Sequence, residues 1–250
     1  MSFSKKFINF LLIFVVAFSF LGFSLNVEAA TSGPNNGGTF TNDATIGTLA
    51  WTNPFNAQTL NGVYATAALT TGTTTQYLKA TNFGFAIPAG SVINGIQVSI
   101  TRDGAVGNKI KDSSLKLVKG GVIGGTDHSA GASWANGDTL VTYGSTSDLW
   151  GLTWTSADIN SSNFGFVISA TATGSRTATI DNINITVTYT SGNTAPNAPT
   201  LVSPASGSST NDNTPTLSAN YSDPDAGDVG TTNYRIATSA ANCLAGTVVA

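Results

Sequence analysis

Two segments of the chain alternate strictly between apolar and polar residues, and this pattern narrows the possible folds more than any other. Ile96, Val98 and Ile100 alternate with polar residues, and the same spacing recurs over 183–189. Successive side chains of a β-strand point to opposite faces, so such segments form strands with one face in a core. Glu, a strong helix former, occurs only at position 28, and helical signals are almost absent between residues 44 and 190. The chain is therefore expected to be all-β.

Shorter runs of the same kind extend this expectation along the chain. They are separated by Gly, Asn, Asp and Pro, and they predict further strands near 63–69, 76–87, 114–123, 139–143 and 149–154. The sequence Thr-Ser-Ala-Asp at 155–158 has capping-box spacing and predicts one short helical turn. We predict that residues 44–190 form an antiparallel β-sandwich, jelly-roll-like, with about eight or nine strands.

A short sequence repeat lies inside this predicted domain. Asn-Phe-Gly-Phe-Ala-Ile at 82–87 recurs as Asn-Phe-Gly-Phe-Val-Ile at 163–168, and each copy leads into one of the alternating segments. The repeat suggests pseudo-symmetric halves whose matching strands occupy equivalent places in two packed sheets. Alternatively, Phe-Gly-Phe is ordinary core chemistry that packs two rings. Both interpretations predict a buried core position for Phe83, Phe85, Phe164 and Phe166.

The N-terminal segment, residues 1–29, has the features of a signal peptide. A start with two Lys precedes an almost unbroken apolar run over 7–25, and small residues at 27 and 29 favour a cut before Ala30. The competing interpretation is an uncleaved membrane anchor, since the run approaches the length that spans a bilayer. We expect cleavage, an extracellular or cell-surface location, and no membrane span in the mature chain.

The charge composition excludes several classes of function. Only 9% of residues are charged, the net charge is −3, and from residue 30 onward eight scattered cations face twelve Asp. Nucleic-acid binding requires clustered cations that displace counterions, so no nucleic-acid partner is expected. The single His128 and the single Cys243 exclude a His/Cys zinc site, and leave a Cys–His nucleophile only if those two residues meet.

Two segments differ in composition from the predicted domains. Residues 30–43 are Thr, Ser, Gly, Asn and Pro without periodicity, which predicts a flexible N-terminal segment. Residues 191–199 combine Pro with Ser and Asn, which predicts a linker between domains.

The residues after this linker carry a family resemblance. Ala-Pro-Thr-Leu-Val-Ser-Pro begins at 198, Thr-Pro-Thr-Leu-Ser-Ala-Asn-Tyr-Ser-Asp-Pro-Asp spans 214–225, and Asn-Tyr-Arg-Ile-Ala spans 233–237. This pattern resembles strands A, B and C of a bacterial immunoglobulin-like or fibronectin type III-like surface module. The match covers about 55 residues of a module of about 100, so residues 200–250 are expected to be a truncated module. The resemblance also implies that Cys243 pairs with a cysteine on a later strand, absent from this sequence.

The first domain carries a resemblance of its own. Phe-Gly-Phe-Ala-Ile-Pro-Ala-Gly-Ser-Val-Ile-Asn-Gly-Ile spans 83–96, and Leu-Trp-Gly-Leu-Thr-Trp-Thr-Ser-Ala-Asp-Ile spans 149–159. These residues are similar to β-sandwich domains of uncharacterised secreted and phage-associated bacterial proteins. The resemblance implies a fold and an extracellular setting, and assigns no activity or binding residues.

Three carboxylates in the second module could bind calcium. Asp223, Asp225 and Asp228 lie within six residues around Gly227, and Ca²⁺ takes six to eight oxygen ligands. The acidic residue that would complete an EF-hand loop is absent, so backbone carbonyls or a neighbouring module would have to complete the site. The alternative is a solvated Asp/Pro/Gly turn.

Aromatic residues could instead supply a platform for sugar rings. Trp150 and Trp154 would share a face if their segment were a strand. The other candidates are Trp51, Trp134, Tyr64, Tyr77 and Tyr143. The alternative is that the Trp residues are buried in the sandwich core.

Catalysis is not expected from this set of residues. A glycosidase would need two suitably spaced carboxyl groups, yet most of the available Asp residues flank Gly, Asn or Ser, as turn residues do: Asp103, Asp112, Asp138, Asp148, Asp158 and Asp181. His128 alone cannot establish a Ser–His–Asp triad. We therefore expect a non-catalytic, exported structural or adhesion protein built of serial β-sandwiches, with an extracellular macromolecular partner. The alternative is a carbohydrate-binding module, as part of a larger extracellular enzyme.

Overall fold

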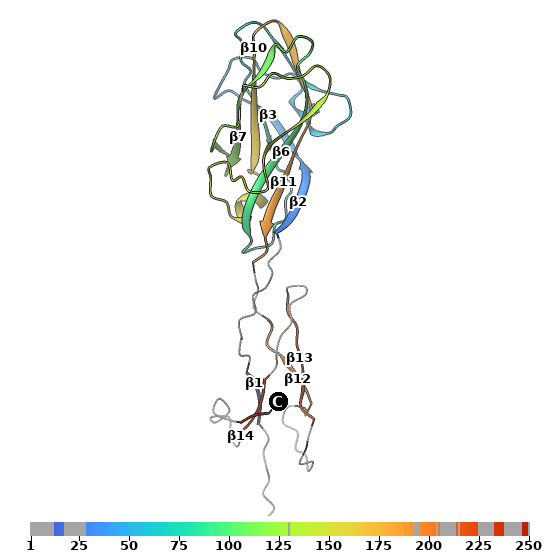
Figure 1. Ribbon diagram of the computed structural model, residues 1–250, viewed down its shortest axis with the longest axis vertical. Coiled ribbons are helices and arrows are strands. Elements are labelled where there is room, and N and C mark those ends of the chain that lie inside the picture. Colours follow the sequence, from blue (N-terminus) through green and yellow to red (C-terminus); the bar gives the residue numbers. More distant parts are fainter. Residues whose placement is uncertain are drawn as a thin grey trace, which may run out of the picture. The chain divides into compact units, whose positions relative to one another are not determined.

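The computed structural model describes most of the chain up to residue 192 and parts of the remaining sequence. It covers residues 29–129, 131–192, 196–203, 205, 214 and 216–224, and the backbone of 13–17, 233–237 and 247–249. These residues are nearly all β, as predicted (Figure 1). The chain divides into two compact units, of which the larger is Val27–Gly192 and the smaller joins Met1–Asn26 to Asn193–Ala250.

The larger unit contains two five-stranded antiparallel sheets. The first, called the β10 sheet here, has the order β3 (Thr39–Asp43), β5 (Tyr77–Thr81), β10 (Gly165–Ala172), β7 (Ile110–Lys119) and β8 (Val122–Gly124). The second, the β11 sheet, has the order β2 (Ala29–Asn36), β11 (Arg176–Thr190), β6 (Val92–Asp103) and β9 (Thr139–Gly144), with β4 (Ala65–Leu69) also pairing with β11. The predicted antiparallel all-β sandwich is confirmed.

The chain crosses between the two sheets at almost every connection. Strands β2, β4, β6, β9 and β11 belong to the β11 sheet, and the strands between them belong to the β10 sheet. Among the described strands of the larger unit, only β7 and β8 are consecutive strands paired in one sheet. A 3-10 turn, η1 (Pro54–Gln58), precedes β4, and a short helix, α1 (Ser156–Asn160), precedes β10. The predicted capping box at α1 is confirmed, because Thr155 and Asp158 each accept a backbone N–H of the other.

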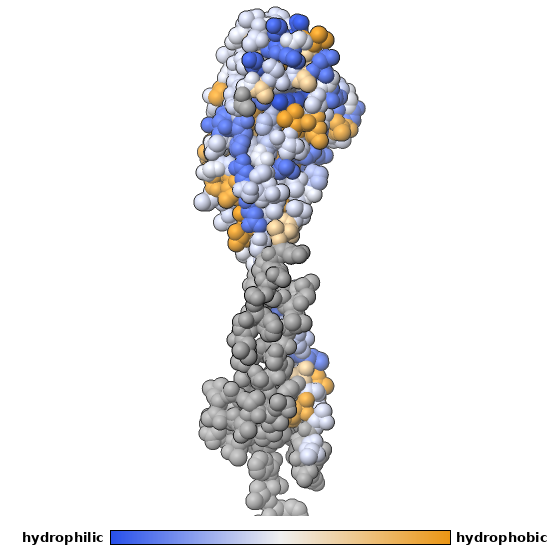
Figure 2. Space-filling model, in the orientation of Figure 1, coloured by the Kyte–Doolittle hydropathy of each residue, from blue (hydrophilic) through white to orange (hydrophobic). Residues whose placement is uncertain are grey.

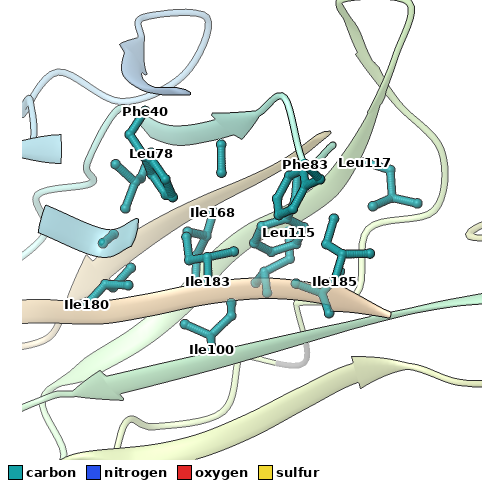
Figure 3. Close-up of a cluster of buried hydrophobic side chains, with 14 of the residues drawn as sticks. Phe40, Leu78, Phe83, Ile100, Leu115, Leu117, Ile168, Ile180, Ile183 and Ile185 are labelled. Atoms are coloured by element: carbon teal, nitrogen blue, oxygen red, sulfur yellow. The ribbon is translucent and has the colours of Figure 1, made fainter. Parts of the chain in front are cut away.

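The core lies between the two sheets, and Figure 3 shows side chains of both sheets pointing toward one another. The inward residues of β6 and β11 follow the predicted alternation, and Ile96, Val98 and Ile100 are fully buried. The four Phe residues of the repeat are buried too, so this prediction is confirmed. The Phe164 ring centroid lies 6.1 Å from that of Phe83.

The two copies of the repeat differ in structure, although the alternating strands that follow them pair with each other. Residues 82–87 lie outside the strands, in contrast to the strand predicted over 76–87, whereas residues 165–168 begin β10. Strand β6, which follows the first copy, pairs antiparallel with β11, which follows the second. Matching positions of the repeat are 96 and 183, 98 and 185, and 100 and 187, whereas the register pairs 96 with 187, 98 with 185 and 100 with 183. Exchanging each residue for its match in the other copy therefore gives the same set of pairs. The pair Val98–Ile185 lies at the centre of this local two-fold relation. The matching strands β6 and β11 are therefore neighbours in one sheet and do not face one another across the core, in contrast to our expectation.

Two further sequence predictions about secondary structure in the larger unit are wrong. Residues 30–43 are not a flexible segment, because 29–36 and 39–43 form β2 and β3. Backbone pairing to β11 and β5, together with the buried ring of Phe40, orders this polar segment without an apolar pattern. Residues 149–154 are not a strand, because Trp150 and Gly151 have positive φ and form a turn.

The smaller unit contains short strands. β12 (Thr200–Ser203) pairs with β13 (Ser218–Asn220), and a separate sheet has the order β1 (Ile13–Ala17), β14 (Asn233–Ala237) and β15 (Thr247–Val249). The immunoglobulin-like identity of this region stays a prediction, and Cys243 lies outside the described residues. Within the described part of the chain, no helix has the length and apolar character needed to cross a membrane.

Candidate functional site

Trp150 and Trp154, predicted as a glycan platform, lie in the core instead. Trp150 is 0% exposed and Trp154 is 9% exposed. Both indole N–H groups donate to backbone oxygens, at 2.9 Å and 3.0 Å. The turn at 149–154 directs both rings inward, so the prediction of an exposed stacking pair is wrong. Trp51 and Trp134 are also buried.

The predicted calcium ligands are only partly described. Asp225 and Asp228 lie outside the described residues. Asp223 accepts a hydrogen bond from the Tyr221 hydroxyl at 3.0 Å. Among the described residues, no group of three His, Cys, Asp or Glu side chains is arranged to hold a metal ion. The calcium site therefore stays a prediction.

Most of the Asp residues weighed for catalysis stabilise turns. Asp181 accepts the backbone N–H groups of Asn61 and Gly62, and Asp103 accepts those of Ala105 and Gly137. These two carboxylates and Asp138 surround Tyr64, whose hydroxyl donates to Asp138 at 2.8 Å. This hydrogen bond is the main reason that the pKa of Tyr64 is raised.

His128 packs against the core and does not form a catalytic triad within the described residues. Its ring centroid lies 4.0 Å from that of Trp150. Its Nε2 lies 3.2 Å from Oδ2 of Asp148, without the geometry of a hydrogen bond. Asp148 in turn accepts the backbone N–H of Trp150 at 2.7 Å. The arrangement holds the 148–151 turn against the loop that contains His128.

A buried ion pair, which was not predicted from the sequence, joins Arg102 of β6 to Asp112 of β7. The two side chains are 3% and 0% exposed. Asp112 also accepts hydrogen bonds from the Trp134 indole at 2.8 Å and from the Tyr143 hydroxyl at 2.7 Å. The available signal was the alternation of β6, which continues from Ile100 to place residue 102 on the inward face.

These four side chains form what we call the Arg102 cluster: Arg102, Asp112, Trp134 and Tyr143. The guanidinium carbon of Arg102 lies 4.5 Å from the Trp134 ring centroid and 5.5 Å from that of Tyr143. Burial raises the pKa of Tyr143, so its hydroxyl remains a donor to Asp112. The cluster ties β6, β7 and β9 to the loop that carries Trp134, and its polar groups face one another.

The outer face of the β10 sheet carries a groove of about 410 Å³, called the outer groove here. Beneath it lies a small hydrophobic cluster separate from the main core, made of Tyr77, Val118 and Val167; all three are buried, and Tyr77 alone of them lines the groove. Ile46 and Ile123 pack against this cluster and line the groove together with the exposed Val122. Tyr77 was among the aromatic candidates predicted from the sequence, but no local pattern indicates which loops surround it.

Two Lys residues lie in one row beside this groove. The register places Lys79 of β5 and Lys116 of β7 on either side of Val167 of β10. Lys79 forms an ion pair with Asp43 at 3.3 Å and donates to the Gly121 oxygen at 3.4 Å. Lys116 lines the groove and forms no ion pair with any described residue.

Polar groups at the groove are held by hydrogen bonds. Asp43 Oδ1 accepts both the backbone N–H and the hydroxyl of Thr45, at 3.1 Å and 2.7 Å. The hydroxyl contributes most to lowering the pKa of Asp43, against the opposing effect of burial. The Tyr77 and Ser114 hydroxyls lie 2.7 Å apart, and Ser114 donates to Asp127. Burial raises the pKa of Tyr77.

Exposed apolar side chains offer a second surface to consider. Of eight large apolar side chains exposed among the described residues, Phe55, Leu60 and Val63 fall in one segment. The Phe55 ring packs edge-on against Phe40 at a centroid distance of 6.4 Å. On the face of the larger unit that Figure 2 shows, hydrophobic residues form separate small patches among neutral and hydrophilic ones.

Comparisons with known proteins do not assign this site. Scans against protein-family models, curated proteins and solved structures found no match for the chain. The functional conclusion therefore depends on the geometry and chemistry of the described residues.

Proposed function

We propose that the larger unit is a non-catalytic binding module of an exported protein, with a structural or adhesive role at the cell surface. The observation that supports this proposal most is that the reactive side chains of the unit form structural hydrogen bonds. Asp127, Asp158 and Asp181 each accept backbone N–H groups that order loops. The Arg102 cluster is buried and internally paired. A rigid sandwich that presents loops and shallow grooves suits contact with a macromolecule.

Export is tested by producing the full chain in a bacterial host and fractionating the cells. We expect the protein outside the cytoplasm, with an intact mass that begins at Ala30. As a matched control, Ala29→Phe places a bulky residue where the signal peptidase requires a small one, and should leave the leader attached. Cytoplasmic retention of the unaltered chain would contradict the proposal.

The adhesive role is tested by incubating the labelled full chain with bacterial cell walls and with insoluble polysaccharides. We expect saturable binding without release of reducing sugar or peptide fragments. Release of soluble products at a rate above that of heat-denatured protein would contradict a non-catalytic function.

A carbohydrate-binding module is the second candidate, and the outer groove favours it. Binding pockets for small ligands are concave and mostly apolar, with a few placed polar groups. The groove combines the apolar side chains of Ile46, Val122 and Ile123 with the polar side chains of Lys116, Asp43 and Thr45. This candidate no longer depends on Trp150 and Trp154.

A further inference from the structure

We propose that the outer groove binds an acidic saccharide, one that carries both hydroxyl and carboxylate groups. The inference rests on the proposed function as a binding module and adds the site and the ligand class. The groove volume of about 410 Å³ lies within the ~300–1,000 Å³ typical of small-ligand sites. That volume accommodates one or two sugar rings of an extended chain.

The apolar side chains that line the groove provide the contact for the C–H face of a sugar ring. Ile46 and Ile123 are partly buried and Val122 is exposed, and all three line the groove. The buried cluster that supports them lies on the opposite side of the β10 sheet from the main core, so its packing is independent of the sandwich interior. A sugar ring that covers Val122 and the two Ile residues would bury apolar surface on both partners.

Lys116 provides the charge that selects a carboxylate. Lys79, in the same row, is already compensated by Asp43, whereas Lys116 forms no ion pair with the described residues. Adjacent strands lie about 4.8 Å apart, so the Cα atoms of these two Lys residues are about 10 Å apart across β10. A carboxylate in the groove therefore reaches Lys116 without competing for Lys79.

Asp43 and Thr45 provide acceptors for sugar hydroxyls. A carboxylate has about four lone-pair positions, and Asp43 uses three of them, two for Thr45 and one for Lys79. The fourth position, on Oδ2, and the Thr45 hydroxyl oxygen can each accept a hydroxyl proton. An acidic peptide would bring carboxylates toward Asp43 without such donors. A uronic acid supplies hydroxyls for Asp43 and a carboxylate for Lys116, and it fits both.

The test measures binding of the full chain to a trimer of galacturonic acid and to the neutral galactose trimer by titration calorimetry. We expect the acidic trimer to bind about tenfold more tightly, because one charge-assisted hydrogen bond is added. Lys116→Met keeps most of the apolar stem and should raise the Kd for the acidic trimer about tenfold. Lys111→Met is the matched control, since Lys111 lies on the same strand outside the groove lining, and it should leave the Kd unchanged.

Each other outcome overturns the inference in a distinguishable way. Equal weakening by Lys111→Met and Lys116→Met would mean a diffuse charge effect. Binding of the acidic trimer that Lys116→Met leaves intact would place the site elsewhere, while glycan binding itself would stand. Binding of an Asp-rich peptide, lost in Lys116→Met, would make the ligand class wrong. If neither trimer binds, the inference fails, and binding to cell walls then decides the proposed function separately.

Discussion

Arg102 is the residue whose environment departs most from that of an ordinary sandwich core. Its guanidinium is 3% exposed, lies between two aromatic rings, and pairs with a carboxylate that accepts two further hydrogen bonds. Removing both charges from water is costly, and their attraction offsets that cost only while every partner is present. The Nε atom of Arg102 is buried without a hydrogen-bond partner among the described residues, so the guanidinium is not fully hydrogen-bonded.

Arg102→Met is expected to reduce the free energy of unfolding by about 3–5 kcal/mol, because it leaves the Asp112 carboxylate buried and unpaired. The double variant Arg102→Met/Asp112→Leu should lose much less, since no uncompensated charge remains. Denaturant unfolding of both variants and of Asp112→Leu completes a double-mutant cycle. Losses that simply add would show that the pair is not coupled.

Asp127 is expected to make the stability of the folded state depend on pH in the acidic range. Burial alone would raise its pKa, but hydrogen bonds from Leu115, Ser114 and Ser129 together lower it below the ordinary value. A carboxyl whose pKa is lower in the folded state stabilises that state above the unfolded pKa, about 3.9. That contribution is lost as the pH falls through the folded pKa.

Asp127→Asn should therefore be less stable than the unaltered chain at pH 7, by about 1 kcal/mol for the lost charged acceptor. The difference should shrink as the pH drops below about 4, because the carboxyl then protonates in both states. Thermal unfolding between pH 2 and pH 7 measures it. A constant difference at every pH would contradict the role of the charge.

At the scale of the elements, the motif Asn-Phe-Gly-Phe adopts different backbone structures in its two copies. Gly165 begins β10, and a Cβ there would lie 2.1 Å from the Ala80 backbone oxygen of β5. Gly84, its equivalent in the other half, has φ +67° and open space around its Cβ position. The first Gly is required by the close approach of two strands, and the second by its backbone conformation.

Gly165→Ala is therefore expected to destabilise the protein more than Gly84→Ala, although the local sequences are nearly identical. The Gly84 variant should lose about 1–2 kcal/mol, the cost of a left-handed residue with a Cβ. The Gly165 variant must also separate β5 from β10 and should lose more. Chemical denaturation of the two variants gives the comparison, and equal losses would show that β5 moves without cost.

Elements that arise from local sequence signals could be predicted. Elements that form by pairing with strands far away in the sequence could not. The alternation at 96–100 and the capping box at Thr155 are local signals, and both predicted the structure. β2 and β3 carry few apolar residues and are ordered by partners far away in sequence, which a local pattern does not reveal. The turn at Trp150 was missed because its aromatic residues mimic a strand.

The candidate site was less predictable than the fold, for a similar reason. Tyr77 and the six Asp residues were recognised as groups capable of chemistry, but their roles depend on neighbours from other strands. The outer groove combines residues from β3, β5, β7, β8 and the loops beside them. The Arg102 cluster likewise joins residues from β6, β7 and β9 to one loop. Such assemblies depend on tertiary pairing.

At the scale of the whole molecule, the crossing of the chain between sheets makes the larger unit cooperative. Neighbouring strands such as β5 and β10 are more than eighty positions apart in the sequence, so neither sheet can form before most of the unit is folded. Proteins dominated by distant contacts fold slowly. The larger unit has its own core, made entirely of its own residues.

The larger unit should therefore persist when the chain is cut between the two units. We expect limited proteolysis at the predicted linker, 191–199, to leave a resistant fragment of about residues 27–192, with the unfolding midpoint of the full chain. Mass spectrometry identifies the fragment and calorimetry gives its midpoint. Loss of the whole chain without such a fragment would show that the core depends on the smaller unit.

The antiparallel pairing of the first and last strands of this unit determines how it responds to mechanical load. Ala29 at the start of β2 pairs with Thr190 at the end of β11, so the chain enters and leaves at the same end of the sandwich. A pull on both ends acts across the ladder, and its hydrogen bonds, which lie perpendicular to the strands, break one at a time. β2 would peel away at low force, as a zipper opens, whereas strands pulled from opposite ends resist in shear. This unit is therefore suited to the free end of a filament, where its two ends are not pulled apart, rather than to a position within the filament that carries the tension.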